Sequence, residues 1–161
     1  MRFYSLPYAL GAIGVIYIGF LVFFSNRKSR VNVSFFSLCI ILAVWLIAYA
    51  ISFSTTSPVV AYSFARIACT AVAFTTPTLY LFVALYLGKF EQEKKYIYLC
   101  YGILLFMFPF FIFTNLFLGD YRQYSWGYYS KAGPLHPLYL LVWVSVWTKG
   151  LPLFFDKRMW D

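Results

Sequence analysis

The sequence predicts an all-α fold: a polytopic membrane helix bundle with about five transmembrane helices. Of its 161 residues, 63% are hydrophobic and only 11% are charged, whereas a typical soluble domain carries about 25% charged residues. The apolar residues gather in runs, and roughly 20 apolar residues suffice for a helix to cross a hydrocarbon core of ~30 Å. Helices are expected rather than lone strands, because a lone strand leaves its backbone polar groups unpaired in lipid.

Five apolar runs account for these helices in chain order. The predicted spans are residues 6–24, 33–53, 59–87, 96–118 and 137–155. The first run is not a cleavable signal peptide, because no small-residue cleavage site ends it and a basic cluster follows it. We therefore expect one membrane-embedded domain over residues 1–161, with no cytoplasmic output domain in this chain.

The basic residues predict the partners and the orientation. They fall in short clusters between the apolar runs rather than along one face, which indicates a lipid bilayer and no nucleic acid as partner. Three residues lie on one side: Arg2, Arg122 and Lys131. Eight lie on the other side: Arg27, Lys28, Arg30, Lys89, Lys94, Lys95, Lys157 and Arg158. Because cytoplasmic loops carry the excess of Lys and Arg, the N-terminus is predicted outside and the C-terminus inside.

The third run carries small residues on one helix face, since Ala61, Ala65, Cys69 and Ala73 recur every four residues. Such a face lets a second helix approach closely. Two prolines lie inside the third and fourth runs, Pro77 and Pro109. Each is either a tolerated distortion or a hinge that transmits motion, and the sequence leaves both readings open.

The segment between the fourth and fifth runs is rich in aromatic residues, with four tyrosines and Trp126 in residues 119–136. Tyrosine and tryptophan favour the interface between lipid and water. We interpret this segment as an interfacial belt, and a ligand-binding cap over the bundle is the alternative.

Arg66 is a permanent charge inside the third run. That run has 29 residues and would span roughly 43 Å as a helix, longer than the hydrocarbon core. Counting back about 20 residues from Gly88 places Arg66 at the outer boundary. Asp120 is expected at the same depth, which predicts an Arg66–Asp120 pair. Contact with a ligand is the alternative role of Arg66.

The residues that catalysis or metal binding would need are scattered. His136 stands alone, and Cys39, Cys69 and Cys100 show neither disulfide nor metal-ligand spacing. The five acidic residues are expected in loops or in the tail. Lys149 has no acid near it in the sequence and is expected to extend toward the cytoplasmic face. We predict no catalytic residue, no cofactor and no metal, and hence no enzyme.

Three stretches together show a family resemblance. They are "NRKSRVNVSFFSLCIILAVWLIAYAISF", "FARIACTAVAFTTPTLYLFVALYLGKF" and "TNLFLGDYRQYSWGYYSKAGPLHPLYLL". Over about residues 6–143 the chain resembles the seven-helix N-terminal region of bacterial sensor histidine kinases. The matching positions are Asn32, Trp45, Tyr49, Ala50, Arg66, Pro77, Phe82, Tyr86 and Gly88.

The resemblance implies a multi-pass protein of the bacterial plasma membrane that senses an input and relays it, by helix repacking, to a kinase or cyclase module. Because the family has seven helices and we count five, the chain looks truncated. The residues we would assign to structure or ligand contact are Arg66, Trp45, Asp120 and Trp126. A homodimer or partner membrane helices stay open, as does the ligand. The alternatives are a small transporter or channel subunit, with its path lined by threonines, or a non-functional fragment.

Overall fold

The computed structural model describes the backbone of residues 3–124 and 127–154, and their side chains except at residues 3, 120, 121, 127 and 151–154. Within these ranges it contains five long helices and one two-stranded sheet. In chain order the elements are η1 (Phe3–Ser5), α1 (Leu6–Ser25), α2 (Arg30–Ser54), α3 (Pro58–Tyr86), α4 (Phe90–Phe113), β1 (Leu118–Tyr124), β2 (Gly127–Ala132) and α5 (His136–Phe154).

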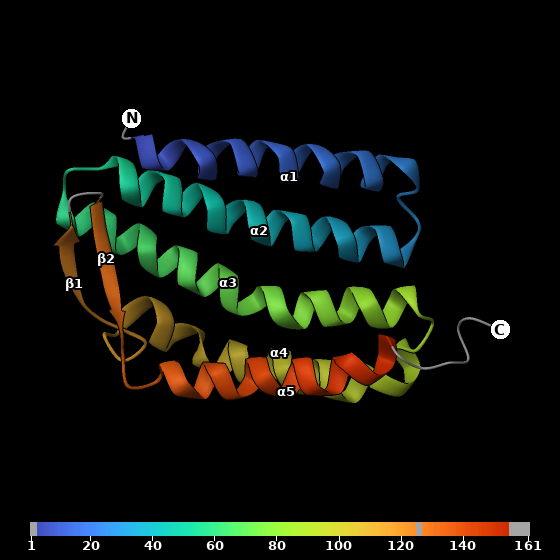
Figure 1. Cartoon of the computed structure of the whole chain (residues 1–161). Coiled ribbons are helices and arrows are strands. Elements are labelled where there is room, and N and C mark those ends of the chain that lie inside the picture. Colours follow the sequence, from blue (N-terminus) through green and yellow to red (C-terminus); the bar gives the residue numbers. More distant parts are fainter. Residues whose placement is uncertain (1–2, 125–126, 155–161) are drawn as a thin grey trace.

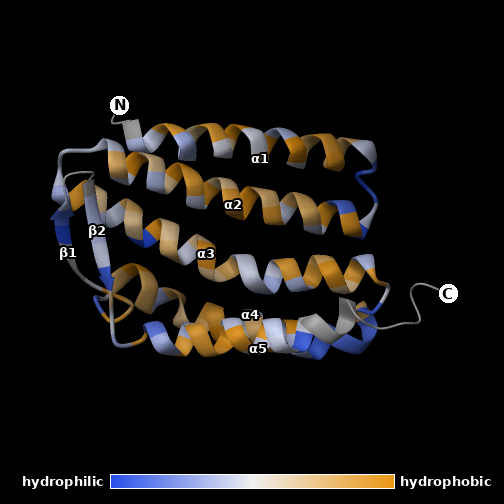
Figure 2. Ribbon diagram, in the orientation of Figure 1, coloured by the Kyte–Doolittle hydropathy of each residue, from blue (hydrophilic) through white to orange (hydrophobic). Residues whose placement is uncertain are grey.

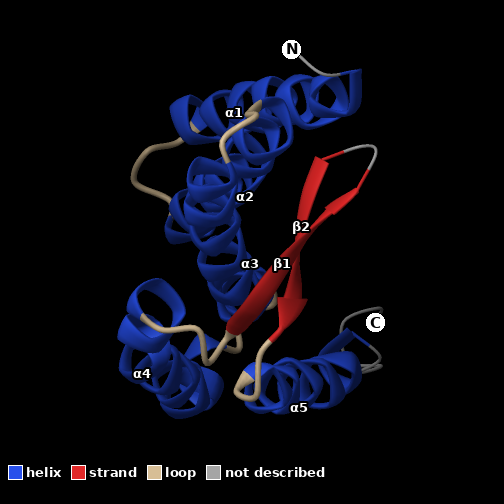
Figure 3. Ribbon diagram, turned by 90° about the vertical axis from the view of Figure 1, so that its left-hand side faces the viewer, coloured by secondary structure: helices blue, strands red, loops and turns tan. Residues whose placement is uncertain are grey.

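The five helices lie lengthwise beside one another (Figure 1). Helices α1, α2 and α3 form a row, and α4 and α5 flank the far edge of α3 (Figure 3). We call the end that carries the β hairpin and the α2–α3 turn the hairpin end. The opposite end carries the α1–α2 and α3–α4 loops, and we call it the basic end (Figure 1).

The prediction of an all-α polytopic membrane bundle is confirmed. Four described helices, α1 to α4, are long and apolar enough to cross a membrane. Hydrophilic residues gather near the two ends, and apolar residues cover the helices between them (Figure 2). Large apolar side chains face outward, with Phe106 74% and Phe113 77% exposed. Apolar faces of this extent are stable against lipid chains and not against water. That α5 forms a fifth span stays a prediction.

The predicted end of the fourth span is wrong. Helix α4 covers Phe90–Phe113 instead of residues 96–118, and Leu118 belongs to a strand. The helix begins early because Glu91 and Glu93 lie in its first turn, where the positive end of the helix dipole favours acidic residues. These two acids are therefore helical, although the sequence placed them in a loop.

The aromatic segment after α4 forms a β hairpin, and its place as an interfacial belt stays a prediction. Strands β1 and β2 pair antiparallel, with Arg122 opposite Tyr129 and Tyr124 opposite Gly127. Tyrosine favours strands, and an edge at the membrane surface can bond to water. The base is closed where the amide of Gly133 donates to the carbonyl of Phe117 at 2.8 Å. Strand β2 lies against α2 and α3 (Figure 3).

Helix α3 is the centre of the packing. The small residues of its predicted face are buried at Ala61, Ala65 and Ala73 and half-buried at Cys69, which supports the predicted close approach, and α2 packs extensively on α3. One core cluster joins α3 to α4, β1 and α5 and includes Leu104 and Phe117.

Both predicted proline positions lie inside continuous helices, Pro77 in α3 and Pro109 in α4. The ribbon of α3 changes direction about halfway along its length (Figure 1). A proline removes one backbone hydrogen bond from the helix ladder, which accounts for such a bend. Whether the bend works as a hinge stays a prediction.

Candidate functional site

The candidate site lies at the hairpin end, where the first three turns of α3 face the segment that connects α4 to β1. Pro58 starts α3, as suits a proline in a first helical turn. Tyr62 and Arg66 follow four residues apart, so both side chains lie on one face of the helix. We call Tyr62, Arg66 and Asn115, with the backbone carbonyls they contact, the Arg66 cluster.

Arg66 bonds to the C-terminal end of α4. Its Nη1 donates to the carbonyl oxygen of Ile112 at 2.8 Å. Its Nη2 donates to the side-chain oxygen of Asn115 and, at 3.2 Å, to the hydroxyl of Tyr62. The guanidinium carbon also lies 4.5 Å from the centre of the Tyr62 ring. Arg66 thus supplies donors and a positive charge to a helix end that has unbonded carbonyls and a partial negative charge.

Tyr62 extends the same contacts into the hairpin. Its hydroxyl lies 2.7 Å from the carbonyl oxygen of Leu118 and 3.0 Å from that of Gly119. Both acceptors belong to β1. The Arg66 cluster therefore joins three elements that are distant in the sequence, namely α3, the end of α4 and the start of the hairpin.

One donor of Arg66 stays without a protein partner among the described residues. Its Nε is buried and makes no hydrogen bond there, while the side chain as a whole is half-buried. An arginine can donate five hydrogen bonds in a fixed plane. The cluster thus mainly links the three elements, and the buried Nε–H group has no hydrogen-bond partner among the described residues.

The predicted partner of Arg66 is not tested by this geometry. The backbone of Asp120 lies in β1, one residue beyond the Gly119 carbonyl that Tyr62 approaches, but its side chain is outside the described residues. The Arg66–Asp120 pair therefore stays a prediction. Trp126 also lies outside the described residues.

Trp45 belongs to a separate aromatic group on α1 and α2. Its ring centre lies 6.1 Å from that of Tyr49, and the Tyr49 ring stacks on Phe53 at 5.4 Å. Tyr8 of α1 lies 5.8 Å from Tyr49. The Tyr49 hydroxyl reaches the sulfur of Cys69 at 3.7 Å. Trp45 thus helps to pack α2 and does not join the Arg66 cluster.

His136 begins α5, as expected for a residue at a helix start. Its ring lies 5.2 Å from that of Phe117 and 5.8 Å from that of Tyr139. Its Nδ1 is buried without a hydrogen-bond partner in the described part of the chain. In residues 3–124 and 127–154, no three His, Cys, Asp or Glu residues come together in a group that could hold a metal ion.

The expectation that Lys149 has no acidic neighbour is wrong. Its Nζ lies 3.1 Å from a carboxylate oxygen of Glu93, and the same oxygen accepts from the Tyr80 hydroxyl at 2.8 Å. Lys149 also sits over the ring of Tyr96 at 4.2 Å. Glu93 is 56 positions before Lys149 in the chain (149 − 93). The two charges come together only because α4 and α5 run in opposite directions and both pack on α3.

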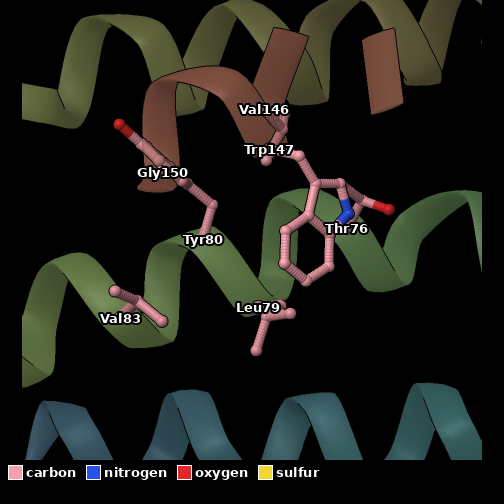
Figure 4. A pocket seen from close by; sticks show the side chains of 7 residues that line it. All are labelled: Thr76, Leu79, Tyr80, Val83, Val146, Trp147 and Gly150. Atoms are coloured by element: carbon pink, nitrogen blue, oxygen red, sulfur yellow. The ribbon is translucent and has the colours of Figure 1, made fainter. Parts of the chain in front are cut away.

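A narrow crevice lies between α3 and α5 close to this ion pair (Figure 4). It encloses about 60 Å³ and its walls are nearly all apolar. Gly150 faces the ring of Tyr80 across it, where a β-carbon on the glycine would stand 3.4 Å from the ring. Figure 4 shows Trp147 reaching down from α5 toward α3. The crevice starts at Thr76, beside the proline of α3.

Sequence reasoning missed Tyr62, Asn115 and Glu93. Tyr62 carried a usable signal, because a tyrosine one turn before a membrane arginine shares its face. Asn115 carried none, since the fourth span was expected to continue past it. Glu93 was assigned to a loop, so its distance from α5 could not be judged.

The chain matches a known protein family. A family model described as "N-terminal 7TM region of histidine kinase" matches residues 7–158 of the chain. The chain has no match among the curated proteins or among the solved structures.

Proposed function

The chain belongs to the family of the N-terminal seven-transmembrane region of histidine kinases, and we propose that it receives a signal at the hairpin end and relays it to the basic end by repacking its helices. The family comprises membrane sensory input regions and not the catalytic domain. The chain is accordingly a multi-pass protein of the bacterial plasma membrane.

The observation that carries the proposal is the bonding of Arg66 and Tyr62 to two other elements. Through Arg66, α3 holds the carbonyl of Ile112 at the end of α4, and through Tyr62 it approaches the carbonyl of Leu118 in β1. A displacement of the hairpin therefore either breaks these bonds or shifts α3 with it. Membrane-embedded polar contacts of this kind are rare and commonly functional.

Helix α3 also has the features needed to pass a shift along the bundle. Its bend and the crevice at Thr76 lie between the two ends. At the basic end the Tyr80 hydroxyl of α3 holds Glu93 of α4, which in turn holds Lys149 of α5. A movement of the half of α3 at the basic end thus changes the positions of α4 and α5 together.

A relay requires two helix packings and a stimulus that stabilises one of them. The proposal can be tested without knowing the stimulus, because loosening the Arg66 cluster should alter the balance between the packings. The test variant is Tyr62→Phe, which removes only the hydroxyl that approaches the hairpin carbonyls. The readout is the distance between spin labels at Ser25 and Gln92, two exposed positions at the basic end, in the full chain in lipid nanodiscs.

We expect Tyr62→Phe to change the distribution of label distances, whereas Tyr17→Phe leaves it unchanged. Tyr17 is the matched control because it is 63% exposed on α1. The native cysteines would be replaced by alanine in all variants. The relay is contradicted if Tyr62→Phe speeds tryptic cleavage of the hairpin at Arg122 or Lys131 but leaves the distances at the basic end as they were.

The transporter alternative finds no support in the threonines that could line a path. Thr70, Thr75 and Thr78 each donate from their hydroxyl to a backbone carbonyl four residues earlier in α3. Such side chains complete their own helix rather than solvate a passing solute. Solute flux through the reconstituted chain would argue for the transporter class instead.

A further inference from the structure

We propose that the groove between α2, α3 and α4 at the basic end binds one anionic phospholipid, with its headgroup on Lys28 and Arg30 and an acyl chain along the groove. The groove has a volume of about 480 Å³. Its charged mouth lies at the start of α2, and its walls are apolar. This site is additional to the sensory relay and does not depend on it.

The headgroup end of the groove carries two positive charges, from Lys28 in the α1–α2 loop and from Arg30 at the start of α2. Lys28 and Arg30 both line it, and in the described part of the chain neither forms an ion pair with a carboxylate. Glu91 of α4 interacts electrostatically with Arg30, but its carboxylate forms its ion pair with Lys94, at 2.6 Å. The N-terminal turn of α2 adds its partial positive charge at the same place. The negative charge of a phosphate group complements these two side chains and the start of the helix.

The walls behind the charges suit an acyl chain. Ser34 and Ser37 line the groove from α2, but their hydroxyls are already bonded to backbone carbonyls of their own helix. The other wall residues of the groove are Val33, Leu81, Leu85, Phe90 and Tyr98. Behind the charged mouth the groove therefore presents an apolar surface.

A second apolar groove lies farther along the same three helices, between the first groove and the hairpin end. It encloses about 460 Å³ and is lined by residues that include Ile40, Val44 and Phe74. From Arg30 to Val44 the axis of α2 rises about 21 Å at 1.5 Å per residue. One leaflet of a hydrocarbon core of ~30 Å is about 15 Å deep. The two grooves together are thus long enough for one acyl chain.

The test is native mass spectrometry of the full chain in mild detergent, with equal amounts of phosphatidylglycerol and phosphatidylcholine carrying the same acyl chains. We expect the wild type to retain phosphatidylglycerol in preference. In the double variant Lys28→Gln/Arg30→Gln the affinity for phosphatidylglycerol should fall about thirtyfold, as two basic residues facing an anionic lipid imply. The matched control is Arg122→Gln/Lys131→Gln, which removes the same charge at the hairpin end and should leave binding unchanged.

A second pair of variants separates the groove from simple charge attraction. Ser37→Trp fills the groove without changing any charge, and it should also weaken retention of phosphatidylglycerol. Ser63→Trp is the control, because Ser63 is also exposed and bonds a backbone carbonyl at the same 2.9 Å. Equal retention of the two lipids by the wild type, an equal loss in both charge variants, or wild-type binding by Ser37→Trp would each overturn the proposal.

Discussion

Arg66 illustrates why the chemical type of one residue matters in this bundle. Its two terminal nitrogens bond three different acceptors, from Ile112, Asn115 and Tyr62. A lysine has one compact ammonium at the end of a flexible chain and lacks this planar fork. The charge also lies over an aromatic ring, where an arginine is favoured. The structure therefore depends on a guanidinium at this position and not simply on a positive charge.

We predict that Arg66→Ala lowers the free energy of unfolding by about 1–3 kcal/mol, the usual contribution of hydrogen bonds to a charged group, because its acceptors are only partly buried. Arg66→Lys should lie between Ala and wild type, since an ammonium reaches some of the acceptors. The measurement is unfolding of the purified chain in detergent by added sodium dodecyl sulfate, followed by circular dichroism.

The control for this prediction is Arg122→Ala, because Arg122 is an exposed arginine of the hairpin. An exposed substitution of this kind should change stability by no more than about 0.5 kcal/mol. Equal losses for Arg66→Ala and Arg122→Ala would show that the Arg66 cluster contributes nothing specific to the fold.

At this scale the sequence identified Arg66 but not its partners. A single charge in an apolar run is conspicuous because it is costly in lipid. Its partners are set by where α4 ends, and the sequence hides that end because apolar residues resume after Thr114 and Asn115 and continue to Leu118. Asn115 and the carbonyl of Ile112 become candidates only once the helix is known to end at Phe113.

At the scale of elements, the hairpin is the part that sequence reasoning did not anticipate. Its strands carry many tyrosines, and the same composition is typical of an interfacial loop. What distinguishes the hairpin is the pairing of residues 118–124 with 127–132, which is a property of two segments together. The helices, by contrast, follow from apolar runs of membrane length, so most of their ends differ by only a few residues from those expected.

We predict that Gly133→Ala opens the base of the hairpin. A β-carbon at Gly133 would lie 2.3 Å from the carbonyl oxygen of Leu116. Because that oxygen belongs to the backbone and not to a flexible side chain, the clash can be relieved only by moving the chain. The same glycine donates its amide to Phe117. The measurement is the rate of tryptic cleavage at Arg122 and Lys131, which should increase because protease access requires the strands to separate.

Gly14→Ala provides the matched control. Gly14 lies in α1, and an added β-carbon would meet nothing within 4 Å. Replacing a helix-interior glycine with alanine usually stabilises a helix by roughly 0.5–1 kcal/mol. If Gly133→Ala leaves cleavage as slow as in wild type and Gly14→Ala, the hairpin base is not held by this close approach.

For the whole molecule, the structure shows polar fastenings at both ends and apolar packing between them. The Arg66 cluster connects α3 to α4 and, through Tyr62, to the hairpin, while Glu93 connects α3, α4 and α5 at the basic end. Lys149 and Glu93 could not have been paired from the sequence, because their proximity depends on how three helices pack. The fold class, in contrast, could be predicted from composition alone, since few soluble proteins combine so few charges with so many apolar residues.

The predicted orientation, with the N-terminus outside, depends on the charge counts at the two ends, and chemical labelling of single cysteines can test it. Single cysteines at Ser25 and Lys131, both exposed, would report the basic end and the hairpin end. In intact spheroplasts a membrane-impermeant maleimide should label Lys131→Cys, and it should label Ser25→Cys only after permeabilisation.

Neutralising Arg27, Lys28 and Arg30 with glutamine reduces the cytoplasmic excess from eight against three to five against three. Because this excess determines topology, the triple variant should show partial labelling at both positions, and an unchanged pattern would mean that other forces fix the orientation.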